Sequence, residues 1–473
     1  MNPKTSKPIW IVLFALAALC ALTRTAVAAD AVSPAKRYLI TDSGAVADGQ
    51  TLNTKAIQSA IDRCASGGGG VVVVPKGTFM TGAIFLKQGV DLTVEKDGVL
   101  KGTANREDYP RVQTRWEGEE REWICALVNA FNMTNFKLTG EGMIDGSGDV
   151  WHGGGRRGGG ARGAGTNAPS RGLTFADAAD GRGARGPAPG AAAGTNAAPR
   201  QFGGGGSPRL IAIQSCTNVL VSGLNCKNEA SWCLFMVYSE KVLAENVTIR
   251  AEHYIPSSDG IDIDSCRNVI IRGCDIDCND DDIAIKSGKD EDGRRVNRPC
   301  EDVIIEKCTF RYGHGGVSMG SETSGGIRNI EIRDCVMMAD NWAPIRFKTQ
   351  PSRGGVVENI TYRNIVLQDT RKAFEFNMEW RMVNPKPPSD PLPIMRNVKI
   401  INVSGTTQLV GDMHGLKDSP VRNVSFENCK IKAPRGFTID NVEKIDLSGL
   451  TIEGVQGQAI IRRGAPQQPA AQP

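Results

Sequence analysis

A short motif that returns at intervals constrains the fold of this 473-residue chain more than any other feature. It reads Asn-Val-x-Ile-x-x-Cys/Leu-x-Ile, with Asp for Asn in one copy and Ile for Val in two. The copies begin 22 to 38 residues apart, at Asn218, Asn246, Asn268, Asp302, Asn329, Asn359, Asn397 and Asn423. Such spacing fits a coil of two or three short strands stacked on the coil before it. We therefore predict an all-β chain folded as a parallel β-helix, because a sandwich would not explain a fixed motif at coil-length intervals.

The N-terminal part is expected to begin the same β-helix behind a capping helix. Asn53 is a suitable N-cap residue, and Gly67 ends the predicted helix shortly after Cys64. One face of this helix is apolar and consists of Ala56, Ile57, Ala60, Ile61 and Cys64. Short apolar runs between turn residues predict strands at 38–42, 71–74, 82–86, 90–94 and 98–100.

Three segments differ in composition from the β-helix. Lys4 and Lys7 precede an apolar run, and residues 26–28 are Ala-Val-Ala, which predicts a cleaved signal peptide over residues 1–28. An uncleaved anchor is the alternative. Residues 153–207, rich in Gly, Ala and Arg, and the tail 464–473 have little to bury and are predicted to be disordered. The β-helix would then occupy residues 29–152 and 208–463, the second part would carry the active site, and the protein would be secreted or periplasmic.

The formal net charge of +4 is unevenly distributed along the chain. Residues 1–28 carry +3 and residues 152–207 carry +5, so the rest of the chain carries −4. A body of this charge is not expected to bind nucleic acid, and an anionic ligand must be held by local cations. We expect a monomer that has no membrane contact once the signal is cleaved.

The cysteines follow the repeat. Twelve of the thirteen lie beyond the predicted signal, which in a secreted protein favours disulfides. However, one motif position holds Cys274, Cys308, Cys335 and Cys429 in four copies, and Leu224, Ile365 and Val403 elsewhere. A position shared by thiols and aliphatic side chains is a packing position, so we predict mostly free, buried cysteines. One or two disulfides elsewhere stay as an alternative, and no Cys-x-x-Cys pairing with His indicates zinc.

Acidic residues gather within the repeat region. Asp280 and Asp281 follow Asp259 by 21 and 22 residues, which is one short coil. Residues at one register in successive coils lie about 4.8 Å apart, so the three carboxylates are expected to cluster. Because clustered carboxylates repel, one of them is expected to hold a proton near neutral pH, as glycosidic cleavage requires. A calcium site or solvated turn acids is the alternative.

Basic residues follow at the next two coils. His314 lies one longer coil after the acids, and Arg346 and Lys348 lie one coil further. Arg346 and Lys348 share one strand face, with Phe347 turned inward. Together with the three acids, these residues are expected to line one groove across four coils. The two cations suit a substrate that is itself a carboxylate.

These segments resemble the polygalacturonases of glycoside hydrolase family 28. The family motifs Asn-Thr-Asp, Asp-Asp, Gly-His-Gly and Arg-Ile-Lys correspond to Ser257-Ser258-Asp259, Asp280-Asp281, Gly313-His314-Gly315 and Arg346-Phe347-Lys348. The match continues after the histidine through Gly-Gly-Val-Ser-Met-Gly-Ser, and it covers roughly residues 37–460 apart from the insertion. The resemblance implies a single-stranded right-handed parallel β-helix. It also implies inverting hydrolysis of α-1,4-galacturonosidic bonds in pectin, with no metal or other cofactor.

The resemblance also implies a role for each acid and for the histidine. Asp280 would be the general acid, Asp259 and Asp281 would activate the water, and His314 would support the protonation and position of Asp280.

The same resemblance implies that Arg346 and Lys348 bind the galacturonate carboxylate on the leaving-group side. Three features depart from the family pattern. Ser257-Ser258 replaces Asn-Thr, and Asp282 replaces a Cys. The tyrosine that the family places about 35 residues after the arginine is not evident, although Trp380 lies near that point. These departures leave the exact substrate open.

Other functions stay open from the sequence alone. A related pectin, such as rhamnogalacturonan or xylogalacturonan, is one alternative substrate. A polysaccharide lyase on the same scaffold would need a calcium site and a basic residue, and a carbohydrate-binding protein would need no aligned acids. Trp232 is expected to give either a sugar-stacking face or a core contact, and His253 is expected to be a loop histidine. The sequence does not distinguish internal from terminal cleavage.

Overall fold

The structure, a computed structural model, describes residues 35–152, 206–381 and 386–463. Backbone contacts divide the chain into Met1–Lys36 and Arg37–Pro473, and every element below lies in the second unit. The predicted signal peptide (1–28) and tail (464–473) lie outside the described residues. So do all but the last two residues of the predicted insertion (153–207).

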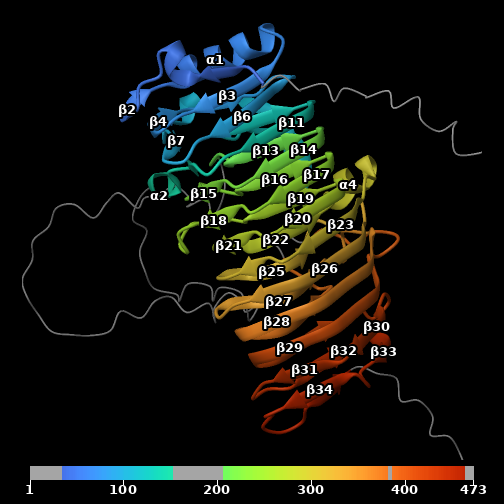
Figure 1. Cartoon of the computed structure of the whole chain (residues 1–473). Coiled ribbons are helices and arrows are strands. Elements are labelled where there is room, and N and C mark those ends of the chain that lie inside the picture. Colours follow the sequence, from blue (N-terminus) through green and yellow to red (C-terminus); the bar gives the residue numbers. More distant parts are fainter. Residues whose placement is uncertain (1–34, 153–205, 382–385, 464–473) are drawn as a thin grey trace, which may run out of the picture. The chain divides into compact units, whose positions relative to one another are not determined.

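Parallel strands stack coil on coil through the second unit (Figure 1). Most strands pair with the strand three places later in the chain: β13 (Ile211–Gln214) pairs with β16 (Leu234–Val237), which pairs with β19 (Ile261–Asp264). Each coil therefore contributes to three ladders. The long strands β28 (Val356–Asn377) and β29 (Ile394–His414) pair with each other through all three. The predicted parallel β-helix is confirmed.

The three ladders are named here by what they carry. The site ladder, which bears the groove described below, comprises β5 (Ile84–Phe85), β10 (Val128–Phe131), β13, β16, β19, β22 (Asp281–Lys286), β25 (Gly313–Met319), β27 (Asn341–Lys348), β32 (Phe437–Asp440) and β35 (Ile460–Arg463). The motif ladder comprises β1 (Arg37–Leu39), β3 (Gly70–Val74), β6 (Val90–Val94), β11 (Thr134–Thr139), β14 (Thr217–Ser222), β17 (Glu240–Glu245), β20 (Arg267–Arg272), β23 (Cys300–Glu306), β26 (Ile327–Met337), β30 (Val421–Glu427) and β33 (Val442–Asp446). The third ladder comprises β2 (Asp48–Leu52), β4 (Gly77–Thr81), β7 (Gly98–Gly102), β12 (Met143–Asp145), β15 (Asn225–Lys227), β18 (Thr248–Arg250), β21 (Asp275–Asp277), β24 (Thr309–Phe310), β31 (Cys429–Lys432) and β34 (Leu450–Glu453).

The first residue of the motif has a backbone role. It adopts the left-handed conformation, with φ of 58° at Asn329, Asn359 and Asn397, which asparagine tolerates better than most residues. Its amide then bonds the equivalent residue of the preceding coil. Asn359 Nδ2 donates to Asn329 Oδ1 at 3.2 Å, and Asn397 Nδ2 donates to Asn359 Oδ1 at 3.1 Å. The repeat thus encodes a bend and a hydrogen-bonded stack.

One copy of the motif was placed wrongly. The register pairs Val219 with Val242 and Val242 with Val269, so Lys241 occupies the position of Asn218 and Asn268. Lys241 also has the left-handed φ of 55°. The copy at Asn246 instead precedes β18 of the third ladder, so it does not lie on the motif ladder.

The core is a stack of aliphatic, aromatic and thiol side chains inside the coils. All twelve cysteines among the described residues are free and buried, which confirms the packing interpretation of Cys308 and its equivalents. Aromatic rings stack in register as well: Phe347 of β27 and Phe376 of β28 lie 4.3 Å apart between ring centroids.

The predicted capping helix is confirmed as α1 (Thr54–Ser66), which lies at the N-terminal end of the stack in Figure 1. Ile57, Ala60, Ile61 and Cys64 are buried. The predicted side-chain cap is wrong. Asn53 Oδ1 accepts from the Val46 backbone N–H (2.7 Å), so the side chain binds a neighbouring loop instead of the helix end. The strand predicted at 38–42 is also too long, because a 3-10 helix, η1 (Ile40–Ser43), begins at residue 40.

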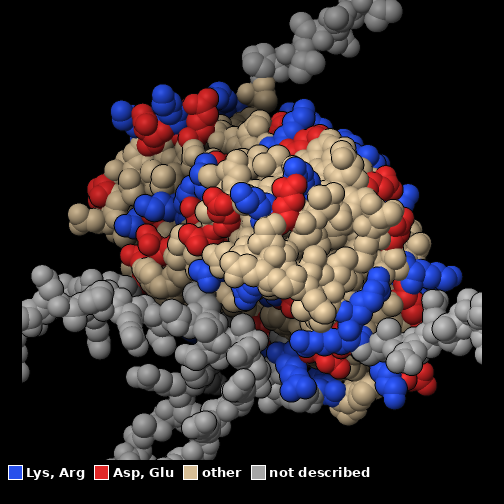
Figure 2. All heavy atoms as spheres, turned by 90° about the horizontal axis from the view of Figure 1, so that it is seen from below, with Lys and Arg blue, Asp and Glu red and all other residues tan. Residues whose placement is uncertain are grey.

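Several elements leave the coils. An antiparallel hairpin of β8 (Arg111–Trp116) and β9 (Glu119–Ile124) follows the 3-10 helix η2 (Arg106–Asp108). Helix α2 (Gly148–Trp151) precedes the undescribed segment, and α4 (Asp290–Val296) follows β22. No helix among the described residues is long and apolar enough to cross a membrane. Seen from the C-terminal end of the stack, Lys and Arg side chains are interspersed with Asp and Glu around the face (Figure 2).

Candidate active site

Three carboxylates converge where the chain enters two neighbouring strands of the site ladder. Asp259 lies shortly before β19, Asp280 lies in a bend before β22, and Asp281 is the first residue of β22. One oxygen of each carboxylate lies within 4.8 Å of an oxygen of each of the others. The bend lets the adjacent Asp280 and Asp281 face one region, which a regular strand would prevent. The one-coil spacing therefore brings the three acids together.

Asp281 is held by groups from the next two coils. Its carboxylate accepts from Ser318 Oγ at 2.7 Å and from Arg346 Nη1 at 3.1 Å, and it also pairs with Lys348 Nζ. Burial pushes the pKa of Asp281 upward, but Lys348 and Arg346 outweigh burial and hold the pKa below its ordinary value. Asp281 is 1% exposed and is an ionised carboxylate at the base of the cluster.

Asp259 is in the opposite electrostatic situation. Lys286 Nζ lies 3.4 Å from Asp259 Oδ2, 3.0 Å from Asp262 Oδ1 and 3.9 Å from Glu322 Oε1, so this cation is shared among three acids. Burial and the negative charges of Asp262, Asp280 and Asp281 raise the pKa of Asp259 well above its ordinary value, although Lys286 opposes them. In the free protein, Asp259 is therefore the favoured site for the proton of the cluster.

Asp280 is the most exposed of the three acids, with 29% of its side chain exposed. His314 Nδ1 lies 3.4 Å from Asp280 Oδ1, and the His314 backbone N–H donates to the Asp280 carbonyl at 2.9 Å. Burial raises the pKa of Asp280, but His314, Lys348 and Arg346 outweigh burial and hold it below its ordinary value. The free protein therefore favours ionised Asp280.

Arg346 and Lys348 project from β27 on the same side, and Phe347 between them points into the core. Arg346 bridges two coils, because its Nε donates to Glu375 Oε2 at 2.7 Å while its Nη1 bonds Asp281. Trp380 lies beside both cations, with its ring centroid 4.9 Å from Arg346 Cζ and 5.5 Å from Lys348 Nζ. Trp380 thus lies near the position at which the family pattern has a tyrosine.

These side chains line a cavity of about 860 Å³ across the site ladder. Five of the six predicted site residues lie on its walls: Asp259, Asp280, His314, Arg346 and Lys348. Asp281 lies beneath them. Trp232 and Glu117 line the cavity at one end, and His414 lines it toward the C-terminal coils. We call this cavity the groove.

Sequence reasoning missed several charged residues of the groove, namely Lys286, Lys372, Glu375 and Asp412, and left His414 unassigned. Ser318, Arg346, Glu375 and Asp412 occupy one register on successive coils. Lys372 Nζ joins Glu375 (2.8 Å) to Asp412 (2.7 Å). The signal was present in the sequence, because Glu375 follows Arg346 by 29 residues and Asp412 follows Glu375 by 37, which are both coil-length spacings.

The departures from the family motifs have distinct structural roles. Ser257 lines the groove, whereas Ser258 is buried and its Oγ donates to the Ile255 carbonyl at 3.0 Å. Asp282 is also buried, and its Oδ2 accepts from Asn341 Nδ2 at 2.7 Å. Burial raises the pKa of Asp282 well above its ordinary value. Burial thus favours the protonated form of Asp282, and Ser257 is the departure that reaches the groove.

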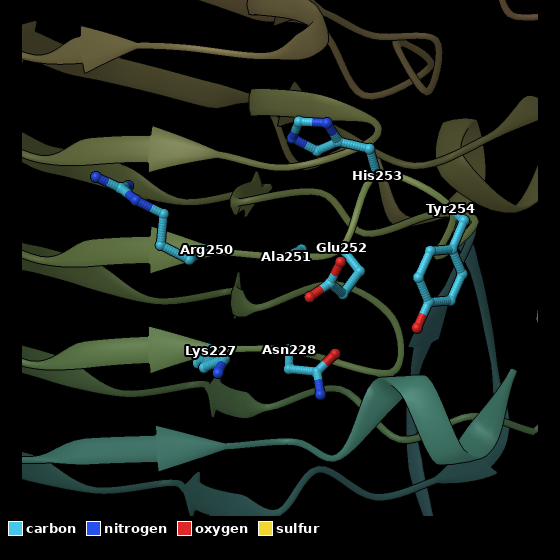
Figure 3. A pocket seen from close by; sticks show the side chains of 7 residues that line it. All are labelled: Lys227, Asn228, Arg250, Ala251, Glu252, His253 and Tyr254. Atoms are coloured by element: carbon cyan, nitrogen blue, oxygen red, sulfur yellow. The ribbon is translucent and has the colours of Figure 1, made fainter. Parts of the chain in front are cut away.

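His253 lies outside the groove. It borders a separate depression of about 430 Å³, which Figure 3 shows beside the loop that follows β18 and carries His253 and Tyr254. Its ring stacks on Tyr312 at 3.8 Å between centroids, and its Nε2 lies 2.6 Å from Asp277 Oδ1. These contacts are those of a loop histidine.

The three clustered acids are also the one group among the described residues that has the spacing of metal ligands. However, Lys348 and Arg346 already pair with Asp281, and Lys286 lies beside Asp259. A divalent cation at this point would lie against three positive side chains. The arrangement favours an anionic ligand near the cations over a metal between the acids.

Comparison with protein families matches residues 176–456 to glycosyl hydrolases family 28. Residues 39–152 match a family described as rhamnogalacturonase A/epimerase, pectate lyase-like.

Individual proteins match over most of the chain. The Vitis vinifera protein named "Probable polygalacturonase" is 28% identical over 87% of this chain and 78% of its own length. The exo-poly-alpha-D-galacturonosidase of Dickeya chrysanthemi is 28% identical over 70% of this chain and 55% of its own length. Among solved structures, a hyperthermoactive exopolygalacturonase from Thermotoga maritima is 30% identical, with a TM-score of 0.70 over 87% of this chain and 92% of that chain.

Proposed function

This chain belongs to family 28 of the glycosyl hydrolases, and from this premise we propose that it hydrolyses α-1,4-galacturonosidic bonds of pectin with inversion. The observation that carries the substrate assignment is the placement of Arg346 and Lys348 within the same groove as the three clustered acids. A uronic acid supplies the carboxylate that these cations would bind, and a neutral sugar does not.

The catalytic role proposed for each acid follows from the exposed fraction of its side chain. Asp280 is the most exposed of the three and donates its proton to the leaving O4 as the C1–O4 bond breaks. A water molecule attacks C1 from the opposite side and gives its proton to Asp259 or Asp281. His314, at 3.4 Å from Asp280, orients that acid.

Substrate binding shifts the proton of the acid cluster from Asp259 toward Asp280. In the free protein, His314 holds the pKa of Asp280 down, and so do the two cations Lys348 and Arg346. A substrate carboxylate bound to these cations brings a negative charge toward Asp280 and offsets their effect. The proton of the cluster then moves toward Asp280, and Asp259 is left ionised to act on water. The titration belongs to the cluster as a whole and not to one residue.

The test is hydrolysis of polygalacturonate in EDTA by the wild type and by Asp280→Asn. We expect new reducing ends without ultraviolet absorbance from the wild type, and a loss of kcat of at least about 10²-fold in the variant, in line with a lost general acid. The matched control is Asp302→Asn on the motif ladder, where asparagine is the usual residue and activity should be unchanged. Near-normal turnover by Asp280→Asn would contradict the assignment, and ultraviolet-absorbing products would favour a lyase.

We also propose that residues 1–28 direct secretion and are then removed, because Lys4 and Lys7 precede an apolar run that ends near Ala-Val-Ala. N-terminal sequencing of the protein recovered from the periplasm or the medium should begin near residue 29. Recovery of the intact N-terminus in a membrane fraction would support an uncleaved anchor.

A further inference from the structure

The β8–β9 hairpin fills one end of the groove with packed rings. Trp116 stacks on Trp123 at 4.6 Å within the hairpin, and on Trp232 of the groove wall at 4.8 Å. Arg209 Cζ lies 4.9 Å from the Trp116 ring centroid and 4.8 Å from that of Trp232. Each of these four side chains is less than a tenth exposed. A sugar chain has no path between them.

The hairpin is also anchored at the end of the site-ladder strands that lies away from Trp232. Arg115 Nη1 donates to Asp264 Oδ1 at 2.7 Å, at the end of β19. At the tip, the Gly118 carbonyl accepts from the Lys289 backbone N–H at 2.9 Å. Gly118 has φ of +81°, and a Cβ there would lie 2.7 Å from Glu322 Cγ of the groove wall. The hairpin therefore spans the width of the groove and packs closely at both of its edges.

At the opposite end of the groove, the described side chains are partly exposed to solvent. Beyond Arg346 and Lys348, the side chains of Asp412 and His414 are 27% and 32% exposed, and Asp440 on the next coil is 30% exposed. These polar side chains continue along the site ladder toward its last coils. A chain bound at the cations can therefore extend in this direction.

We infer that the hairpin makes the groove blind at Trp232, so that the protein cleaves from a chain end and not within the chain. This inference rests on the proposed function. Cleavage within a polymer requires that the chain pass the reacting acids and continue on both sides. Among the described residues, the path continues only past the cations. Since Arg346 and Lys348 are proposed to bind the leaving-group side, the terminus held against Trp232 is the non-reducing end.

The test follows wild-type digestion of an oligogalacturonate labelled at its reducing end, with polygalacturonate digested in parallel. We expect the labelled species to shorten stepwise, one short product to accumulate from the first time point, and viscosity to fall only slowly per bond cleaved. Labelled fragments of all lengths at the earliest times, with a rapid fall in viscosity, would overturn the inference. Absence of any cleavage would overturn the proposed function and the inference with it.

A shortened hairpin provides the second test. Replacement of Gln113–Glu122 by two glycines removes Trp116 and the tip while retaining the base of both strands. We expect the viscosity loss per bond cleaved to increase about tenfold as internal bonds become accessible. Glu122→Gln, which alters an exposed side chain of β9, should keep the wild-type product pattern. A folded shortened variant, judged by circular dichroism, with unchanged products would overturn the inference. If the variant does not fold, wild-type digestion of the labelled oligogalacturonate still tests the inference.

Discussion

Arg346 owes its position to Glu375 on the next coil as much as to its own strand. Its Nε donates to Glu375 at 2.7 Å, and Lys372 holds the other oxygen of that carboxylate at 2.8 Å. Burial raises the pKa of Glu375, but Arg346 and Lys372 outweigh it and the pKa lies below its ordinary value. A charge-assisted hydrogen bond therefore orients the cation that is proposed to bind the substrate.

Glu375→Gln keeps the shape of this side chain and removes its charge. Since a hydrogen bond to a charged group contributes about 1.5–3 kcal/mol, we expect kcat/KM on polygalacturonate to fall about tenfold or more, mainly through KM. Glu331→Gln is the matched control, because Glu331 lies on β26 in a part-exposed pair with Arg333 that should contribute little. A fall in kcat with unchanged KM would show that Glu375 does not act through substrate binding.

Glu229 is a buried acid that the proposed reaction does not use. It is fully buried, and neither carboxylate oxygen has a hydrogen-bond partner among the described residues. Burial raises its pKa from 4.5 to about 8. The folded state therefore binds a proton that the unfolded state has released between these pH values. The stability that this group contributes is present below pH 4.5 and is lost as pH rises toward 8.

Glu229→Gln should remove this pH dependence. We expect the decrease in unfolding free energy between pH 5 and pH 8 to shrink by about 3–4 kcal/mol relative to the wild type. Urea unfolding at both pH values measures it, with Glu331→Gln as an exposed control. An unchanged pH dependence would show that Glu229 is ionised in the folded protein.

The six predicted site residues could be located from the sequence because coil spacing places them together. Lys286 and Glu375 were not assigned, although Glu375 has a coil-length spacing from Arg346, since an outward Lys or Glu on a strand is usually a solvated residue. Their roles depend on which side chains lie across the coil boundary. The buried position of Asp282 could not be predicted either, because the bend between Asp280 and Asp281 turns this side chain inward.

At the scale of the element, the motif asparagines combine two functions that the sequence pattern does not show. The residue permits a left-handed bend, and its amide links neighbouring coils. Asn359, with φ of 58°, both donates to Asn329 and accepts from Asn397. The hydrophobic positions of the motif predicted the strands. They did not predict which strands pair with each other, because the copy at Asn246 precedes a strand of the third ladder.

Two substitutions of Asn359 separate these functions. Asn359→Gly keeps the left-handed bend and loses the two side-chain bonds, which should cost about 1 kcal/mol of unfolding free energy. Asn359→Ala loses the bonds and adds backbone strain, for a total of about 2–3 kcal/mol. Chemical denaturation compares the two. Equal destabilisation by Gly and Ala would show that backbone conformation does not explain the asparagine.

The ends of elements were less predictable than their existence. The apolar run at 38–42 was too long because the chain turns into η1 after Leu39. The Asn53 side chain binds the loop at Val46 because that backbone N–H lies within reach at 2.7 Å. Such tertiary competition for a polar side chain is absent from the local sequence.

At the scale of the molecule, the repeat predicted the stack of coils but not the closure of the groove. The strands of the β8–β9 hairpin are polar along much of their length, and their pairing gives no motif. Glu117 and Gly118 both adopt positive φ, as hairpin turns of this kind require, but only Gly118 is a residue typical of such turns. Its position over Trp232 depends on Arg115 reaching Asp264, 149 residues away in the chain. Contacts of this range cannot be read from a repeat.

The central claim is that the three acids hydrolyse galacturonan with inversion. Their nearest oxygens lie within 4.8 Å, whereas the carboxyl groups of a typical inverting pair lie about 6.5–9.5 Å apart, so the stereochemistry is a demanding test. Proton NMR of polygalacturonate digestion in EDTA, recorded before mutarotation, measures it directly. We expect β-configured reducing ends and no 4,5-unsaturated uronate. Initial α-configured ends, or unsaturated products, would contradict it.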